Sequence, residues 1–437
     1  MKRNRILVLS SLALIASGAL VFACGGGDDD NDAGNKDSST NDAKGDTTTP
    51  SDAKNDTTTP QDTGAPDTGS DAPSNDAGAD VTDAAISDAG TGLTFMVARV
   101  GGSSDAGLDA ALTSGSSAPV FLEERNISDG SLVRVLSLPT AVNGQNQPLT
   151  ASITASSEVQ VTTSVDGKLV VLAGFAAAPG IPSIASTSTD GGALRVIARV
   201  DNAGNIDTTT EVSAFDGVDI RAASTVDGGS FWAVGAGAAD AGGGAGVQYV
   251  LIGSTGASTN IESTVPNTRT ANIFGGQLYM GTSVTPNNGV NAVGTGAPTT
   301  SGQTVTLLNG IAGDSGSPYG FSMMDLDASV TGLDTLYIAD DSSQANGGGI
   351  QKWVFDGTSW TKIATFKNGV TTGGFRGVMA IQSGTDVIVI GTTSTETNGN
   401  RIIKYVDDGT NTNPTGTVLV TAPPFTVYRG IAVAPAP

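Results

Sequence analysis

Four arginines stand at similar places in a repeating sequence pattern and are suited to bind a charged group. Arg221, Arg376 and Arg429 each lie near the beginning of an apolar segment with the character of a β-strand, and Arg269 lies close to this place in another copy. A guanidinium binds a carboxylate or a phosphate through two parallel hydrogen bonds. These arginines are therefore candidate ligand-binding residues in a chain that is otherwise acidic.

Two aromatic residues accompany them. Phe375 precedes Arg376, and Tyr428 precedes Arg429, so their rings are candidates to stack on a sugar. The alternative is that each arginine hydrogen bonds to carbonyl groups, or to an aspartate, between neighbouring copies of the repeat. In that case the arginines stabilise the fold and bind no ligand.

Histidine is absent from the chain, and Cys24 is the only cysteine. Intrachain disulfides, histidine-based triads, histidine metal sites and zinc clusters are therefore excluded. Asp340 and Asp341 end a strand-like segment and are weak candidates for holding a divalent metal, with a solvated pair as the alternative. We predict no catalytic residue and no cofactor, and we keep a divalent metal open.

Composition and charge restrict the fold and the partners. Of the 437 residues, 60 are glycines, only 15% are charged, and few are aromatic. This composition favours many short strands joined by tight turns. The formal net charge is −22. Nucleic acid is excluded as a partner because its binding needs a basic surface.

Residues 1–23 have the features of a secretory signal peptide. Lys2, Arg3 and Arg5 precede an apolar run at 6–22 that is interrupted only by serine and glycine. A membrane span is the alternative, but the run is short for a bilayer and has no basic flank after it.

The end of this run, Val21-Phe22-Ala23-Cys24 followed by Gly25, resembles the lipobox of bacterial lipoproteins. The resemblance implies that Cys24 becomes the lipidated N-terminus. It also implies an outer-membrane location, periplasmic or surface-exposed, because the aspartate that retains lipoproteins in the inner membrane is not present at position 25. Several acyl chains on one residue make such an anchor effectively permanent.

Residues 24–92 have the composition of a disordered linker. Between positions 25 and 91 they contain 16 aspartates against three lysines, with many Thr, Pro, Gly and Ala and almost no large apolar residue. Such a segment cannot bury enough apolar surface to offset the entropy of ordering it. We expect it to act as a spacer between the anchor and a folded domain at 93–437.

Residues 93–437 contain a repeated unit of four strands. Its first turn contains Gly or Asp-Gly in most copies, as tight hairpins require, and it recurs at 165–168, 226–229, 274–277, 327–334 and 382–385. The final strand-like segment, 428–433, matches the first strand of a sixth unit, and 95–100, 120–125 and 132–138 can supply its other three strands. The predicted fold is an all-β, six-bladed β-propeller of four-stranded antiparallel blades with roughly 57 residues each, closed by strands from both termini.

Two stretches resemble blades of NHL-repeat propellers. They are 335–341 with 349–353, and 387–391 with 400–405, in which a strand is followed by a loop and a strand containing a basic residue before an aromatic one. The resemblance implies a propeller that serves in most cases as a binding scaffold and in a minority as an enzyme.

The loops between the second and third strands of each unit are long, whereas most of the other turns are short. Binding residues concentrate on loops that a rigid scaffold holds, so the long-loop face is the predicted binding face. The leading hypothesis is a monomeric, surface-tethered, non-enzymatic scaffold for a protein or glycan ligand. The alternatives are a metal-dependent propeller hydrolase or lyase similar to gluconolactonases, and a structural component of the cell envelope.

Overall fold

The computed structural model describes residues 92–102, 115–188, 192–237, 244–311, 313, 315–369, 373–394 and 399–437. The predicted signal peptide, Cys24 and the linker up to residue 91 lie outside these residues. The described part is all-β and propeller-like. Its helical elements are one short α-helix, α1 (Ile184–Thr187), and one 3-10 turn (Gln344–Asn346), and no helix in these ranges is long and apolar enough to cross a membrane.

Four sheets of four antiparallel strands follow one another along the described chain. The first turn of the second of these sheets shows why glycine recurs there. Gly275 and Gly276 have φ values of 54° and 74°, and a two-residue hairpin with positive φ at both positions matches the twist of its strands. The four sheets are β9 (Ile220–Ser224), β10 (Ser230–Gly235), β11 (Val247–Leu251) and β13 (Thr259–Glu262); β14 (Thr268–Phe274), β15 (Gln277–Thr282), β16 (Gly289–Val293) and β17 (Val305–Leu307); β18 (Pro318–Met324), β19 (Thr335–Asp340), β20 (Gly349–Phe355) and β21 (Trp360–Phe366); and β22 (Phe375–Ser383), β23 (Asp386–Thr393), β24 (Arg401–Asp407) and β25 (Thr417–Thr421).

The remaining strands form one ten-stranded sheet, where the sequence had predicted two separate units. The two units are joined by β4 (Thr150–Ser152), which is buried and pairs with both β2 (Ser117–Asn126) and β6 (Leu169–Phe175). The strand from the end of the chain, β26, pairs antiparallel with β1, and Val97 lies opposite Ile431. The other members of this sheet are β1 (Thr94–Val100), β2 (Ser117–Asn126), β3 (Leu132–Ser137), β5 (Thr162–Thr163), β6 (Leu169–Phe175), β7 (Arg195–Asp201), β8 (Ile206–Val212), β12 (Thr255–Gly256) and β26 (Val427–Val433).

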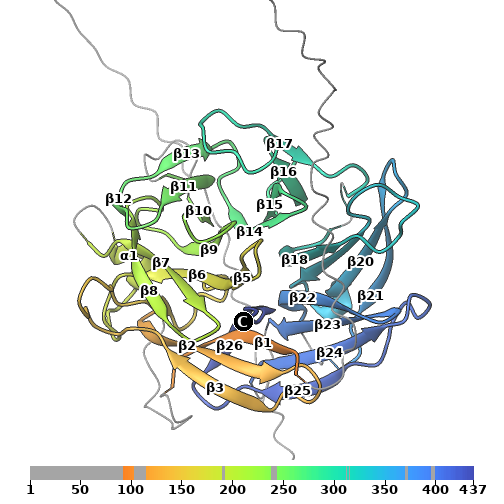
Figure 1. Ribbon diagram of the computed structural model, residues 1–437, viewed down its shortest axis with the longest axis horizontal. Helices are drawn as coiled ribbons and strands as arrows, with labels where there is room; N and C mark the ends of the chain where they lie inside the picture. Colours follow the sequence, from red (N-terminus) through yellow and green to blue (C-terminus); the bar gives the residue numbers. More distant parts are fainter. Residues whose placement is uncertain are drawn as a thin grey trace, which may run out of the picture. The chain divides into compact units, whose positions relative to one another are not determined.

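The inner strands of neighbouring sheets lie side by side. β26 contacts β22, β22 contacts β18, β18 contacts β14, β14 contacts β9, β9 contacts both β5 and β6, and β5 contacts β26. Figure 1 shows these strands around a common centre, with the other strands of each sheet outside them. The beginnings of the inner strands therefore come together, although they are distant in sequence.

Apolar side chains fill the space between neighbouring sheets. One buried cluster joins Tyr337 and Phe366 to Phe375 and Tyr405, with tilted or edge-on ring contacts. At Gly430 in β26 the backbone approaches so closely that a Cβ atom would lie 2.1 Å from the backbone nitrogen of Val161. Only glycine allows this contact between β26 and the segment before β5.

A network of buried charges lies in the sheet formed by β26, β1 and β2. The Arg99 Nε donates to Glu123 Oε1 at 2.5 Å, and Arg125 Nη2 donates to Glu123 Oε2 at 2.6 Å. The Tyr428 hydroxyl donates to the same Oε2 at 3.0 Å. The network thus connects strands from the two ends of the described domain.

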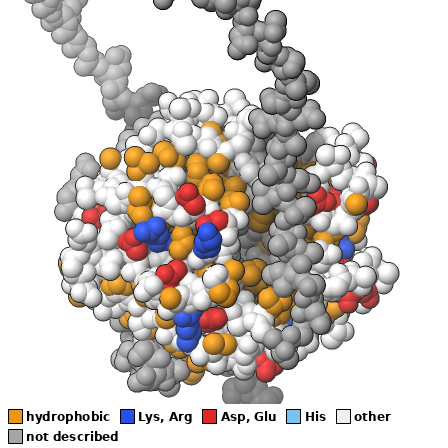
Figure 2. Space-filling view, viewed as in Figure 1, with side chains coloured by type: hydrophobic (Ala, Val, Ile, Leu, Met, Phe, Trp, Pro, Cys, Tyr) orange, Lys and Arg blue, Asp and Glu red, His pale blue; other side chains and the backbone are white. Residues whose placement is uncertain are grey.

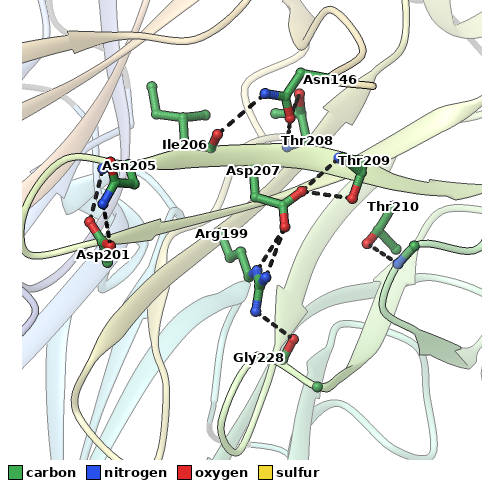
Figure 3. Close-up of polar contacts among 12 residues, drawn as sticks. Asn146, Arg199, Asp201, Asn205, Ile206, Asp207, Thr208, Thr209, Thr210 and Gly228 are labelled. Carbon is green, nitrogen blue, oxygen red and sulfur yellow. Dashed lines mark hydrogen bonds and ion pairs between the residues drawn. The ribbon is translucent and has the colours of Figure 1, made fainter. Parts of the chain in front are cut away.

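Two other ion pairs are more exposed. Figure 3 shows Arg199 of β7 donating to Asp207 of β8 and to the carbonyl of Gly228, which belongs to the next sheet's first turn. Arg134 of β3 pairs with Glu124 and donates to the carbonyl of Asn202. Figure 2 shows basic and acidic side chains beside one another on one face, so this face has no separate field of one charge.

Candidate ligand-binding site at the inner strands

Four sheets present a polar side chain at the same place of the inner strand. Arg221 in β9, Arg269 in β14, Tyr319 in β18 and Arg376 in β22 are each the second residue of their strand. Arg429 is the third residue of β26. We call these five residues the mouth residues, because the beginnings of the inner strands meet there.

Arg221 and Arg269 are held by neutral groups of the next sheet along the chain. Arg221 Nη1 donates to Asn267 Oδ1 and, at 3.2 Å, to the carbonyl of Thr268. Arg269 Nη1 donates to Ser317 Oγ at 2.8 Å and to the carbonyl of Pro318 at 3.1 Å. Within the described ranges neither guanidinium forms an ion pair with a carboxylate, so its charge is not neutralised by direct contact. Each also makes these hydrogen bonds through a single nitrogen.

Tyr319 lies between two of the arginines. The guanidinium carbon of Arg269 is 4.1 Å from the centroid of the Tyr319 ring, and that of Arg376 is 5.1 Å from it. Such cation–π contacts contribute about 0.5–2 kcal/mol each. Burial is the main cause that lowers the pKa of Arg221; Asp219, Tyr319 and Glu158 oppose this shift, and Arg269 adds to it.

The two aspartates proposed as weak metal ligands have other partners. Asp341 Oδ2 lies 3.0 Å from both Nε and Nη2 of Arg376. Asp340 is buried, and its oxygens accept hydrogen bonds from the backbone amides of Ser317 and Ser342 and from the side chain of Gln351. These contacts occupy part of the hydrogen-bonding capacity of the two carboxylates. Across the described residues no group of three or more His, Cys, Asp and Glu side chains could hold a metal ion.

Arg429, in contrast to the other mouth arginines, is fully buried. Its Nη1 is 3.4 Å from Glu158 Oε2, and its Nη2 donates to the carbonyl of Ser152. Burial lowers the pKa of Arg429 and raises the pKa of Glu158 well above its ordinary value; Arg429 opposes the shift of Glu158, and Asp219 adds to it. Arg429 is therefore not exposed to a ligand.

The two aromatic candidates lie in the core. Phe375 is fully buried against Tyr405, and Tyr428 is 2% exposed with its hydroxyl on Glu123. Each ring belongs to a buried apolar cluster. Neither ring faces the mouth. Tyr319 was not identified as a site residue from the sequence, because a tyrosine stands there in place of the arginine of the other copies. The glycine that follows Tyr319 could have indicated its position, since glycine also follows Arg376 and Arg429.

The alternative role of the arginines, holding neighbouring sheets together, is present in the structure. Arg221 and Arg269 reach carbonyls of the next sheet, and Arg376 reaches Asp341 of the preceding one. In these contacts Arg221 and Arg269 donate through Nη1 alone, and Arg376 donates through Nε and Nη2. Arg221, Arg269 and Arg376 are each partly exposed.

Comparisons with known proteins show likeness of fold only. No protein-family profile and no curated protein sequence matches the chain. A solved structure of a nidogen/laminin complex is 11% identical, with a TM-score of 0.43, over 78% of this chain and 98% of that one. A putative 6-phosphogluconolactonase from Bacteroides uniformis is 13% identical, with a TM-score of 0.42, over 76% and 82%. A putative glucose dehydrogenase from Thermus thermophilus is 12% identical, with a TM-score of 0.37, over 66% and 93%. At these values the likenesses carry no argument about activity.

Proposed function

We propose that this protein is a lipid-anchored, exported binding protein of the bacterial cell envelope whose domain binds an anionic ligand, a glycan or a protein, at the mouth residues. One observation carries the proposal. Arg221 and Arg269 hold positive charge at the beginning of adjacent inner strands with only neutral hydrogen-bond partners in the described residues. A cation without a contacting carboxylate is suited to pair with an incoming anion.

The surroundings make this charge distinctive. Residues 93–437 contain 15 basic and 27 acidic residues, so the domain as a whole repels anions. Arg221 and Arg269, which have no contacting carboxylate in the described residues, are therefore a local exception, whereas Arg376 and Arg429 are paired with Asp341 and Glu158. This exception supports a specific ligand site more than general attraction to anionic surfaces or nucleic acid.

We propose that the sheets close into a six-bladed β-propeller. Support comes from the sequence of contacts among the six inner strands and from the antiparallel pairing of β26 with β1. In this arrangement β4 bridges two adjacent blades by pairing with β2 and β6. Closure leaves no inner sheet edge exposed, which suits a rigid scaffold for a binding site.

The lipid anchor rests on the sequence of residues 1–25, and Cys24→Ser tests it. We expect the wild-type chain, produced in a Gram-negative host, to incorporate an alkyne-tagged palmitate and to sediment with membranes. The C24S variant should lose the label and move to the soluble fraction. Retention of the label in C24S would show that another residue is acylated, and an unlabelled wild-type chain would rule out the anchor.

Arg221→Gln and Arg269→Gln test the binding site. We expect each variant to bind acidic oligosaccharides at least about tenfold more weakly than wild type, because each loses a charge-assisted contact of roughly 1.5–3 kcal/mol. Isothermal titration of the full chain with galacturonate oligomers, and with galactose oligomers as neutral counterparts, measures the effect. The matched control is Arg199→Gln, since Arg199 is paired with Asp207 away from the mouth residues.

The control separates a local site from a general loss of charge. Arg199→Gln should change the affinity less than about twofold, because an exposed ion pair contributes little. Equal loss in all three variants, or equal binding of acidic and neutral oligomers, would count against a site at the mouth residues.

A further inference from the structure

Tyr319 is the one mouth residue that carries no charge, yet it contacts two that do. It is 8% exposed, and its ring lies within cation–π distance of both Arg269 and Arg376. Two free guanidinium groups would repel each other and move apart. A ring between them gives each a favourable contact and restricts where it can lie.

The geometry limits the separation of the two charges. Since the guanidinium carbons lie 4.1 Å and 5.1 Å from one ring centroid, they are no more than about 9 Å apart. Arg269 is further held by Ser317 and Pro318, and Arg376 by Asp341. The spacing of the two guanidinium groups is therefore set before a ligand arrives, which reduces the entropy lost on binding. Arg376 is already paired with Asp341, so a ligand carboxylate has to share or replace that partner.

We propose that Tyr319 is a positioning residue that selects a ligand with two acidic groups, and that this ligand is an acidic oligosaccharide carrying carboxylates on neighbouring sugars. The inference rests on the proposed function and specifies its ligand. A single acidic group engages one arginine, whereas two linked acidic groups engage both, and the second contact gains from the linkage.

The neighbouring side chains favour a sugar over an acidic peptide. Asn267 and Ser317 hydrogen bond to the mouth arginines, and such groups also bind sugar hydroxyls. The exposed large apolar side chains among the described residues all lie outside the inner strands. Peptide recognition commonly uses aromatic or aliphatic anchors in a pocket, and within the inner strands themselves the described residues expose no such side chain; Phe425, two residues before β26, is 53% exposed.

Tyr319→Leu and Tyr319→Phe test the proposal in the full chain. The probes are galacturonate, the galacturonate trimer and triglutamate, titrated by calorimetry or NMR. We expect Y319L to bind the trimer about tenfold more weakly while its affinity for the monomer changes less than about twofold. Y319F keeps the ring and should bind the trimer within about threefold of wild type.

The outcomes separate this inference from the proposed function. If wild type binds none of the acidic probes, the proposed function fails. If wild type binds the trimer but Y319L loses monomer and trimer equally, or Y319F fails to restore trimer binding, the positioning role is wrong. Tighter binding of triglutamate than of the galacturonate trimer would overturn the glycan assignment.

Discussion

Replacing Glu123 with alanine is expected to lower the free energy of unfolding by about 3–5 kcal/mol, the range for a buried ion pair that loses one partner. Glu123 is 3% exposed and accepts hydrogen bonds from Arg99, Arg125 and Tyr428. The Arg99 side chain is 1% exposed, so the variant leaves a buried guanidinium without this carboxylate. Urea unfolding followed by circular dichroism measures the change.

Glu124→Ala is the matched control on the same strand. Glu124 pairs with Arg134, whose side chain is 28% exposed, and we expect a loss of about 1 kcal/mol. The double variant R99M/E123L should recover much of the E123A loss, since apolar side chains can replace a buried pair. A loss below about 1 kcal/mol in E123A would contradict the network, and with it a role in joining β26 to β2.

Replacing Asp340 with alanine is expected to cost about 3 kcal/mol of unfolding free energy. Two backbone amides and the Gln351 amide donate to this carboxylate, at 3.0, 2.9 and 2.9 Å, and a buried donor left without its acceptor costs about 1–3 kcal/mol. Asp340→Asn keeps one acceptor oxygen and should lose less. Thermal and urea unfolding of the three proteins, with and without EDTA, measure the effect.

Unfolding with and without EDTA distinguishes a structural role of the Asp340 carboxylate from metal binding. We expect the midpoint of wild type to be unchanged by chelation, and D340A to be destabilised equally with and without EDTA. Asp341→Ala is the control, because its partner Arg376 is partly exposed and the loss should be nearer 1 kcal/mol. A wild-type midpoint that falls with EDTA, and no longer does so in D340A, would identify Asp340 as a metal ligand.

The strands and turns could be predicted from sequence because the signals are local. Positive φ at Gly275 and Gly276 is a requirement of a two-residue hairpin, so the glycines mark the turn without any knowledge of the fold. The pairing of β26 with β1 was also predictable, since the last segment repeats the pattern of an inner strand. β4 was not, because Thr150–Ser152 has no strand pattern of its own and pairs only where β2 and β6 already lie nearby.

The candidate site was predicted in part. The places of Arg221, Arg269 and Arg376 follow from the repeat, and the structure brings all three to the beginnings of inner strands, with β18 between those of Arg269 and Arg376. The partners of these arginines come from neighbouring sheets 35 to 49 residues away in sequence. No local pattern encodes such contacts.

By itself, the sequence determined the chemistry that this chain can use: it has no histidine, a single cysteine, an acidic balance and arginines in a periodic arrangement. Tertiary structure decided which side chains reach the mouth. It placed Phe375 and Tyr428 in the core, put Tyr319 within cation–π distance of two arginines, and gave the Asp340 carboxylate two backbone amides and Gln351 as hydrogen-bond donors. The physical reason is that residue type is a local property, whereas burial and partnership depend on how separate sheets pack against each other.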